Sequence, residues 1–223
     1  MFDWNQVETV FFDMDGTLLD LHFDNFFWLQ HLPVRLSELN NISLDMAQEQ
    51  LRQMFEAHQG TLKWYCLDFW SKELKLDIAE LKEEVSSKIC YRPHVEPLLS
   101  QLCDSNIELA IVTNAHRGSV EIKLENTTLA RYFDEIISSH DIGVEKESLD
   151  FWTKLHKSRA FNPAKTVFFD DNEDVLRAAQ EFGISTLFSI EKPDSQKPRR
   201  IENNFSMVKD FSDFFLPKEN VIL

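Results

Sequence analysis

The sequence predicts an α/β fold in which a parallel sheet is interrupted by an inserted block of helices. A short apolar run at residues 7–12 ends abruptly at an aspartate. Residues 20–91 then show helical but no strand periodicity, and from residue 92 onward apolar strands alternate with helices. Strands that alternate with helices form right-handed βαβ units, which build a parallel sheet covered by helices on both faces.

The first strand is expected at residues 7–12, because short apolar runs that feed a polar loop are typical of buried parallel strands. The helical block follows. Ala47, Leu51, Met54 and Phe55 fall on one helical face, and similar spacing recurs along the block, which predicts roughly four helices. Pro33 is expected to interrupt the first of them, since proline cannot donate a helix hydrogen bond.

The remaining elements are read from the alternating pattern. Strands are expected at residues 107–112, 135–138, 166–169 and 186–189, and helices at residues 95–102, 120–126, 149–158 and 175–182. Gly183 is the expected end of the last helix, and the polar residues 192–200 are expected to form a surface loop. The predicted domains are therefore a core of residues 1–19 plus 92–223 and a cap of residues 20–91 over the strand ends, where ligands bind in such sheets.

Charge and composition limit the possible partners. The 223 residues carry 38 acidic and 23 basic side chains, a formal net charge of −15. Such a surface repels nucleic-acid backbones and anionic membranes, so neither a nucleic-acid polymer nor a membrane is expected as partner. The N-terminal residues lack a signal-peptide pattern, and the three cysteines lack zinc-motif spacing, so a cytoplasmic enzyme with reduced thiols is expected. The residues give no indication of oligomeric state.

The strongest chemical signal is Asp13-Met14-Asp15-Gly16-Thr17 directly after the first strand. Two carboxylates at a strand end can converge on one cation, and a carboxylate can attack phosphorus to form an aspartyl phosphate. Asp15 could protonate the leaving oxygen and then activate water, while Gly16 permits a sharp turn. A solvated turn or a calcium loop are the alternatives, but an EF-hand would carry glycine where Leu18 stands.

Further polar residues end later strands or follow them. Thr113, with the adjacent Asn114, could bind a phosphoryl oxygen, and Lys146 could neutralise the transferring group. Asp170 and Asp171 stand where a strand meets a helix and suit Mg²⁺. Each of these signals alone has a plain alternative, namely a helix cap or a surface charge. Their order along the chain is the stronger argument, because a parallel sheet would bring all of them to one crevice.

This arrangement resembles the haloacid dehalogenase-like (HAD) hydrolase superfamily, whose fold is a Rossmann-like core with, in this case, an inserted helical cap of the C1 type. The resemblance implies Asp13 as the nucleophile and Asp15 as the general acid and base. It implies Mg²⁺ held by Asp13, the backbone carbonyl of Asp15, and Asp171, with Asp170 close by. Two positions depart from the usual pattern: Val144-Glu145 precedes Lys146 where Pro-Lys is common, and Asp170 replaces a frequent glycine.

A narrower resemblance is to the bacterial GMP/IMP nucleotidase branch. It is carried by the segments DMDGTLLD at 13–20, FDNFFW at 23–28, TLKWYCLDFWS at 61–71, VTNAH at 112–116 and KLE at 123–125. The resemblance implies a purine 5′-mononucleotide as substrate. Aromatic cap residues such as Trp64 could stack on the base, and His22 and Asn25, just past the catalytic loop, could contact ribose or base.

Several other functions remain open on the sequence alone. A phosphatase for another small metabolite, such as phosphoglycolate or a sugar phosphate, is the main alternative. A phosphomutase and a non-catalytic binding protein are further ones, although the presence of all four motifs argues against a binding protein. A dehalogenase would not need Asp15, because a halide leaves without a proton. A phospho-accepting receiver domain is about half this length and has no cap.

Overall fold

The computed structural model describes residues 2–216 and contains a six-stranded sheet, which confirms the predicted α/β class. All neighbouring strands are parallel, in the order β3-β2-β1-β4-β5-β6. The strands are β1 (Thr9–Phe12), β2 (Glu108–Thr113), β3 (Glu135–Ser138), β4 (Thr166–Asp170), β5 (Thr186–Ile190) and β6 (Ser206–Val208). The strand order reverses beside β1, and ligands bind at such switch points. Strand β6 was not predicted.

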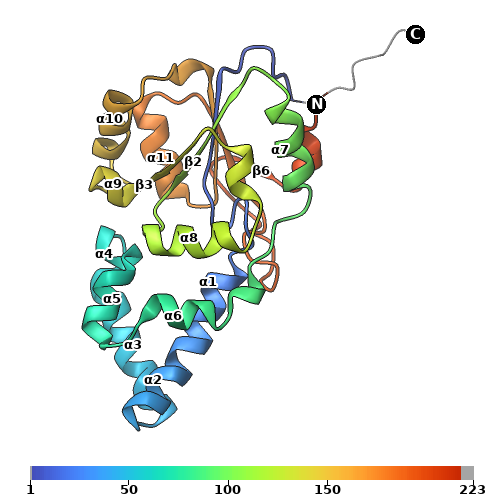
Figure 1. The fold of residues 1–223 in the computed structure, drawn as a ribbon. Helices are drawn as coiled ribbons and strands as arrows, with labels where there is room; N and C mark the ends of the chain where they lie inside the picture. Colours follow the sequence, from blue (N-terminus) through green and yellow to red (C-terminus); the bar gives the residue numbers. More distant parts are fainter. Residues whose placement is uncertain (1, 217–223) are drawn as a thin grey trace.

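Helices cover both faces of the sheet (Figure 1). Helix α7 (Val95–Cys103) and Val120 of α8 (Arg117–Glu125) pack on one face, and α10 (Leu149–Ser158) and α11 (Glu173–Phe182) on the other. Within β1, alternate side chains point to opposite faces, so Phe12 joins the first cluster and Phe11 the second. Strand β1 is therefore buried on both faces, as its continuous apolar sequence predicted.

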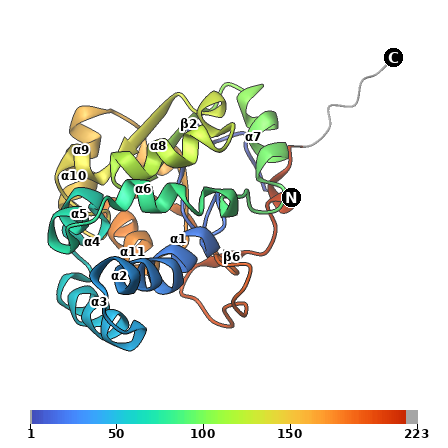
Figure 2. The same ribbon diagram turned by 60° about the horizontal axis from the view of Figure 1, so that its bottom comes forward.

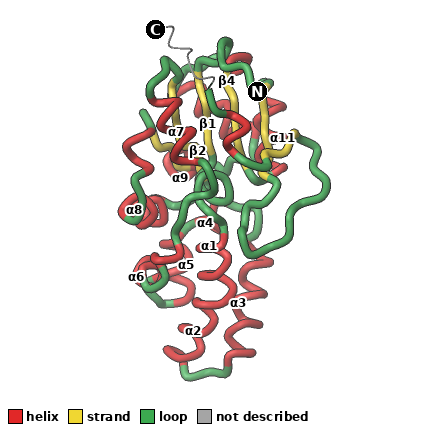
Figure 3. The backbone as a smooth tube through the Cα atoms, turned by 90° about the vertical axis from the view of Figure 1, so that its right-hand side faces the viewer, coloured by secondary structure: helices red, strands yellow, loops and turns green. Residues whose placement is uncertain are grey.

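The chain between β1 and α7 is helical and lies at the carboxyl ends of the strands (Figure 1; Figure 3). It has its own apolar core, around Phe27, Leu51 and Trp70. Its helices are α1 (His22–Phe26), a π-helix (Phe27–His31), α2 (Leu32–Asn40), α3 (Leu44–His58), α4 (Leu62–Tyr65), α5 (Leu67–Leu74), α6 (Ile78–Glu83) and a 3₁₀ turn (Ser86–Lys88). Figure 2 shows α2 and α3 side by side.

The predicted boundaries between core and cap stay a prediction. The helices from His22 to Lys88 fall inside the predicted cap, residues 20–91, and every strand falls inside the predicted core. Residue 1 and residues 217–223, which the prediction assigned to the core, lie outside the described part of the chain. Below, residues 20–91 are called the helical segment.

Pro33 does not interrupt the first helix as expected. Residues 22–40 stay helical throughout, but residues 27–31 wind as a π-helix in which the N–H of Leu32 bonds to the carbonyl of Phe27. A proline ring clashes with the carbonyl four residues earlier in a regular α-helix. The wider π turn directly before Pro33 changes that register, so the chain accommodates the proline without leaving the helix.

The remaining elements are short. They are α9 (Ser139–Ile142) and 3₁₀ turns at Leu129–Tyr132, Pro163–Lys165 and Phe211–Phe214. Helix α11 ends at Gly183, which adopts a φ of 118°, as the sequence predicted. Within residues 2–216, no helix has both the length and the apolar character needed to cross a membrane.

Candidate active site

The Asp13 loop leaves the sheet beside β4. The backbone N–H of Asp13 donates to the carbonyl of Phe169 at 2.8 Å, so the pairing of β1 with β4 continues one residue beyond the strand. Gly16, with a φ of +82°, lies so close to its neighbours that an added Cβ would stand 2.9 Å from Cγ of Asp171. A side chain at position 16 would therefore push the loop away from Asp171, and glycine keeps the two aspartate-bearing loops together.

Lys146 lies at the centre of the acidic residues, although it is 2% exposed. Its Nζ donates to Oδ1 of Asp13 at 2.6 Å, to Oδ2 of Asp170 at 2.7 Å and to the carbonyl of Val112 at 2.9 Å. Burial alone would lower the pKa of Lys146, but the two carboxylates outweigh it and hold this pKa above its ordinary value. The ammonium is therefore charged and fixed against the predicted nucleophile.

Three carboxylates form a candidate metal site. Oxygen atoms of Asp13, Asp170 and Asp171 lie within 4.8 Å of one another. Burial raises their pKa values to about 7, 6 and 7 respectively, and their mutual repulsion adds to this, while Lys146 acts in the opposite direction. Clustered carboxylate oxygens are the ligands that Mg²⁺ prefers, so the donor set fits the predicted ion. The carboxylate of Asp15 is not part of this group.

The raised pKa values predict how stability depends on pH. Because the folded pKa values of these three carboxyls exceed their unfolded values, the folded protein binds more protons near neutral pH. Their contribution to stability is therefore greatest at low pH and is lost as pH rises through about 6–7. EDTA-treated protein should melt at a higher temperature at about pH 5.5 than at about pH 8, and Mg²⁺ should raise the melting temperature more at the higher pH.

Differential scanning fluorimetry measures this effect, and Asp171→Asn is the matched variant. The amide cannot ionise, so the variant should show a smaller loss of stability between the two pH values and a smaller response to Mg²⁺. Equal Mg²⁺ responses of the wild type at both pH values would contradict the assignment of this cluster as the metal site.

A second buried charge cluster holds Asp15. Nζ of Lys123 lies 2.6 Å from Oδ1 of Asp15 and 2.9 Å from Oδ2 of Asp24. Lys82 donates to the other oxygen of Asp24 at 2.6 Å, and both lysines are 1% exposed. Burial raises the pKa of Asp15, and Lys123 opposes this shift. Asp15, the candidate for proton transfer, is thus linked to the helical segment by four side chains of alternating charge, namely Asp15, Lys123, Asp24 and Lys82.

Sequence reasoning did not assign a role to these lysines. Lys82 carried a signal, because it lies on the same helical face as Ile78, Leu81 and Val85 and so occupies an apolar position. Lys123 belonged to a segment noted only for its resemblance to relatives. Its approach to Asp24 of α1 and Lys82 of α6 depends on the packing of the helical segment against the core, in which α6 contacts α8.

Glu147 was also missed, and it connects three parts of the site. It accepts hydrogen bonds from Asn114 Nδ2 at 2.8 Å, from the Tyr65 hydroxyl at 2.7 Å and from Asn172 Nδ2 at 3.2 Å. Oδ1 of Asn114 in turn accepts from the backbone N–H of Lys146 at 2.9 Å. The polar network fixes the loop after β2 relative to Lys146 and contacts the helical segment through Tyr65.

A cavity of about 250 Å³ lies above these groups. The sequence-predicted residues that line it are Asp13, Asp15, Asn25, Trp64, Thr113, Asn114, Lys146, Asp170 and Asp171. His22 is not among the lining residues, and its Nδ1 instead lies 3.7 Å from Oδ1 of Asp194. Asn25 also contacts Asp194, to which its Nδ2 donates at 2.6 Å. On the opposite side the cavity is lined by aromatic and apolar side chains of the helical segment, which are Leu21, Trp28, Leu29, Phe55, Trp64, Tyr65 and Leu67.

Comparison with known proteins agrees with this geometry. Residues 10–189 match the family model of haloacid dehalogenase-like hydrolases. The chain belongs to this family. Among curated HAD-like proteins it is 38% identical to the GMP/IMP nucleotidase YrfG of Escherichia coli strain K12, over 86% of both chains. It is 25% identical to (S)-2-haloacid dehalogenase 2 of Pseudomonas sp. strain CBS-3, over 80% of this chain and 81% of that one.

Solved structures show the same HAD-like fold. A HAD phosphatase from Thermococcus onnurineus superposes with a TM-score of 0.77 at 24% identity, over 93% of this chain and 96% of that chain. The resemblance predicted from the four motifs is therefore confirmed, and the chain is an enzyme of the hydrolase class.

Proposed function

We propose that this HAD-like enzyme is a Mg²⁺-dependent phosphomonoester hydrolase that acts through an aspartyl phosphate on Asp13. The observation that carries the proposal is the position of Asp13 at the end of β1. Its carboxylate is bound by buried Lys146 and lies beside Asp170 and Asp171, at one end of the cavity. A carboxylate needs an adjacent cation to approach an anionic phosphate. Lys146 supplies one cation, and the carboxylates can bind Mg²⁺ as a second.

The proposed reaction has two balanced steps. A carboxylate oxygen of Asp13 forms a bond to phosphorus while the ester P–O bond breaks, and Asp15 gives its proton to the departing oxygen. Asp15 then takes a proton from water, whose oxygen displaces Asp13 from phosphorus and releases inorganic phosphate. The raised pKa of Asp15 supports its role as the acid in the first step. Bound Mg²⁺ would neutralise charge on the phosphoryl oxygens.

Residues of this chain would also hold the phosphoryl group. Thr113 ends β2 and lines the cavity, and its hydroxyl can donate because its oxygen accepts only the backbone N–H of Ala115, at 3.1 Å, within the described structure. Asn114 lies beside it, and Lys146 compensates negative charge from the other side. A halide leaving group would gain nothing from Asp15, so this site supports ester hydrolysis over dehalogenation.

For the substrate we propose a purine 5′-mononucleotide, GMP or IMP, and hence a role in the cytoplasm. The 38% identity to a GMP/IMP nucleotidase supports this choice. The cavity supports a nucleotide as well, because its lining combines the charged catalytic residues with the aromatic rings of Trp28, Phe55 and Trp64. Aromatic faces stack on bases, at about 1–3 kcal/mol per base. The other candidates, phosphoglycolate and sugar phosphates, contain no base that could stack on these rings.

A panel of phosphate esters tests this function. Phosphate release should require Mg²⁺ and stop in EDTA, and kcat/KM should be higher for GMP and IMP than for pyrimidine monophosphates, hexose phosphates and phosphoglycolate. Trp64→Leu should lower kcat/KM for GMP by roughly 5- to 150-fold, the equivalent of one lost stacking contact, and leave kcat/KM for phosphoglycolate, which has no ring to stack, nearly unaffected.

Phe69→Leu is the matched control, because Phe69 is an aromatic residue of the same segment that does not line the cavity. It should leave the preference unchanged. Hydrolysis of phosphoglycolate or a hexose phosphate at a tenfold higher kcat/KM than GMP would reject the nucleotidase proposal and leave the phosphatase proposal standing. Full activity in EDTA would reject the metal requirement.

A further inference from the structure

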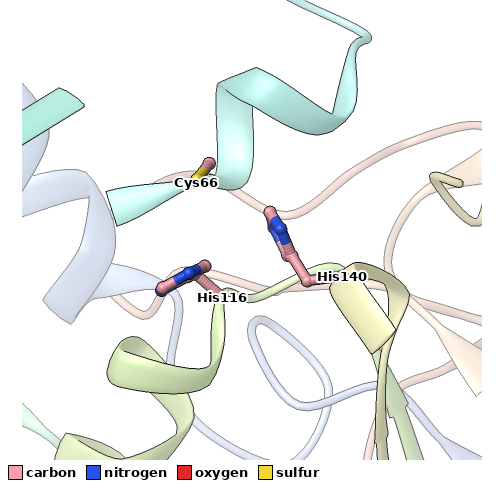
Figure 4. Close-up of side chains that lie close together, drawn as sticks. All are labelled: Cys66, His116 and His140. Carbon is pink, nitrogen blue, oxygen red and sulfur yellow. The ribbon is translucent and has the colours of Figure 1, made fainter. Parts of the chain in front are cut away.

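Three potential metal ligands gather beside the active site. Donor atoms of Cys66, His116 and His140 lie within 4.8 Å of one another (Figure 4). They come from three separate segments: Cys66 lies between α4 and α5, His116 directly precedes α8, and His140 belongs to α9. The two imidazole rings meet edge to face, with centroids 4.9 Å apart. None of the three lines the active-site cavity or belongs to the carboxylate cluster.

We propose that Cys66, His116 and His140 bind a transition-metal ion of the zinc class and thereby tie the helical segment to the sheet core. One thiolate and two imidazoles are the donor types that Zn²⁺ selects. Mg²⁺ and Ca²⁺ prefer oxygen ligands, so this site would not compete with the carboxylate cluster for Mg²⁺.

His140 has a ring nitrogen that is available to bind a metal ion. Its Nε2 is buried and has no hydrogen-bond partner among residues 2–216. A buried nitrogen without a partner costs free energy, which a coordinated metal would recover.

Cys66 and His116 complete the site with complementary features. Cys66 is the N-cap of α5, where its sulfur accepts the backbone N–H of Phe69 at 3.4 Å. Nε2 of His116 lies 3.7 Å from Oδ2 of Asp68, an exposed carboxylate in the first turn of the same helix. Nδ1 of His116 accepts the N–H of Gly118 at 3.3 Å, so Nε2 is the nitrogen left for the metal, and Asp68 beside it is placed to be a fourth ligand.

The position of the site gives it a functional consequence. His116 follows Asn114 by two residues, in the loop proposed to hold the phosphoryl group, and Cys66 follows Trp64 and Tyr65, which line the cavity. A metal bound by both would fix the distance between the two sides of the cavity. Because a helical segment tied to the core could not move relative to it during turnover, Zn²⁺ should slow turnover while Mg²⁺ is saturating. This kinetic consequence rests on the proposed function, but the binding site itself does not.

Cobalt spectroscopy tests the site directly. Protein stripped with EDTA and returned to excess Mg²⁺ is titrated with Co²⁺, because a cysteine thiolate bound to Co²⁺ gives a near-ultraviolet charge-transfer band that carboxylate ligands do not give. The wild type should develop this band to saturation at one equivalent, and Zn²⁺ should abolish it by displacement. Cys66→Ser should show no band. Cys103→Ser, in which the altered residue is the last of α7 and is not part of the proposed cluster, should match the wild type.

His140→Ala provides a second variant that keeps the thiol. It should weaken Co²⁺ binding by at least about tenfold, even if Cys66→Ser fails to fold by circular dichroism. A band that persists in Cys66→Ser, or Co²⁺ affinity unchanged in His140→Ala, would overturn the proposed ligands. In the kinetic arm, Zn²⁺ should slow hydrolysis of p-nitrophenyl phosphate by the wild type and Cys103→Ser but not by Cys66→Ser. Equal inhibition of all three proteins would show that the inhibitory ion binds elsewhere. It would overturn the proposed metal link between the helical segment and the sheet core.

Discussion

Asp13→Asn should lower kcat for phosphate release by at least about 10⁴-fold, since loss of the nucleophile in other enzymes that form covalent intermediates costs up to about 10⁶-fold. The amide keeps the shape of the side chain but cannot attack phosphorus. The substitution also removes one of three mutually repelling buried carboxylates, so the thermal stability of the variant should not fall. Steady-state phosphate release and a melting curve on the same preparation measure both effects.

Trapping the intermediate identifies the nucleophile. Borohydride reduction of the aspartyl phosphate, which converts the modified aspartate to homoserine, should place the modification on Asp13 in the wild type by mass spectrometry. Asp15→Asn keeps the nucleophile, so it should still form the adduct, although it should slow both formation and hydrolysis of the intermediate. A modification found on Asp170 or Asp171 would overturn the assignment of roles.

Lys146→Met should have the second largest effect, a loss of about 10²–10³-fold in kcat, which is the usual cost of removing one preorganised electrostatic donor. The apolar chain has a similar length, but Asp13 and Asp170 would lose the cation that contacts both. Lys146→Arg should restore little activity, because a planar guanidinium does not reproduce three contacts of a compact ammonium made within 2.9 Å.

Lys154→Met is the matched control for charge, since Lys154 lies on α10 with about half of its side chain exposed. It should leave kcat unchanged and shift stability by less than about 0.5 kcal/mol. Activity of Lys146→Met within a few-fold of the wild type would show that the contact with Asp13 does not serve the transition state. If Lys146→Met turns over at a near-normal rate, as Lys154→Met should, the metal alone neutralises the charge of the acidic cluster.

Much of the core could be predicted because parallel strands are buried on both faces. Continuous apolar runs such as Val167-Phe168-Phe169 therefore mark strands directly. Strand β6 escaped prediction because Ser206–Val208 is only three residues long and follows a polar loop. The site residues at strand ends were predictable for a similar reason, since chain order and the parallel topology together place Asp13, Thr113 and Asp170 along one edge.

Residues whose roles arise from distant packing could not be predicted. Lys123 and Lys82 meet at Asp24 from helices 41 positions apart in the chain, and no local pattern specifies that approach. The role of Glu147, which directly follows Lys146, was not predicted, although its carboxylate accepts hydrogen bonds from three segments. His22 shows the opposite case: its closeness in sequence to the catalytic loop did not bring it to the cavity.

The separate apolar core of the helical segment bears on how such an enzyme can change over evolutionary time. Among the described buried residues of that core, Ile122 alone comes from outside residues 23–85. Substitutions that reshape the aromatic side of the cavity therefore disturb packing within the segment and leave the two clusters that support the sheet almost unaffected. New leaving groups can be explored by mutation in one part of the molecule while the phosphate chemistry is inherited intact in the other.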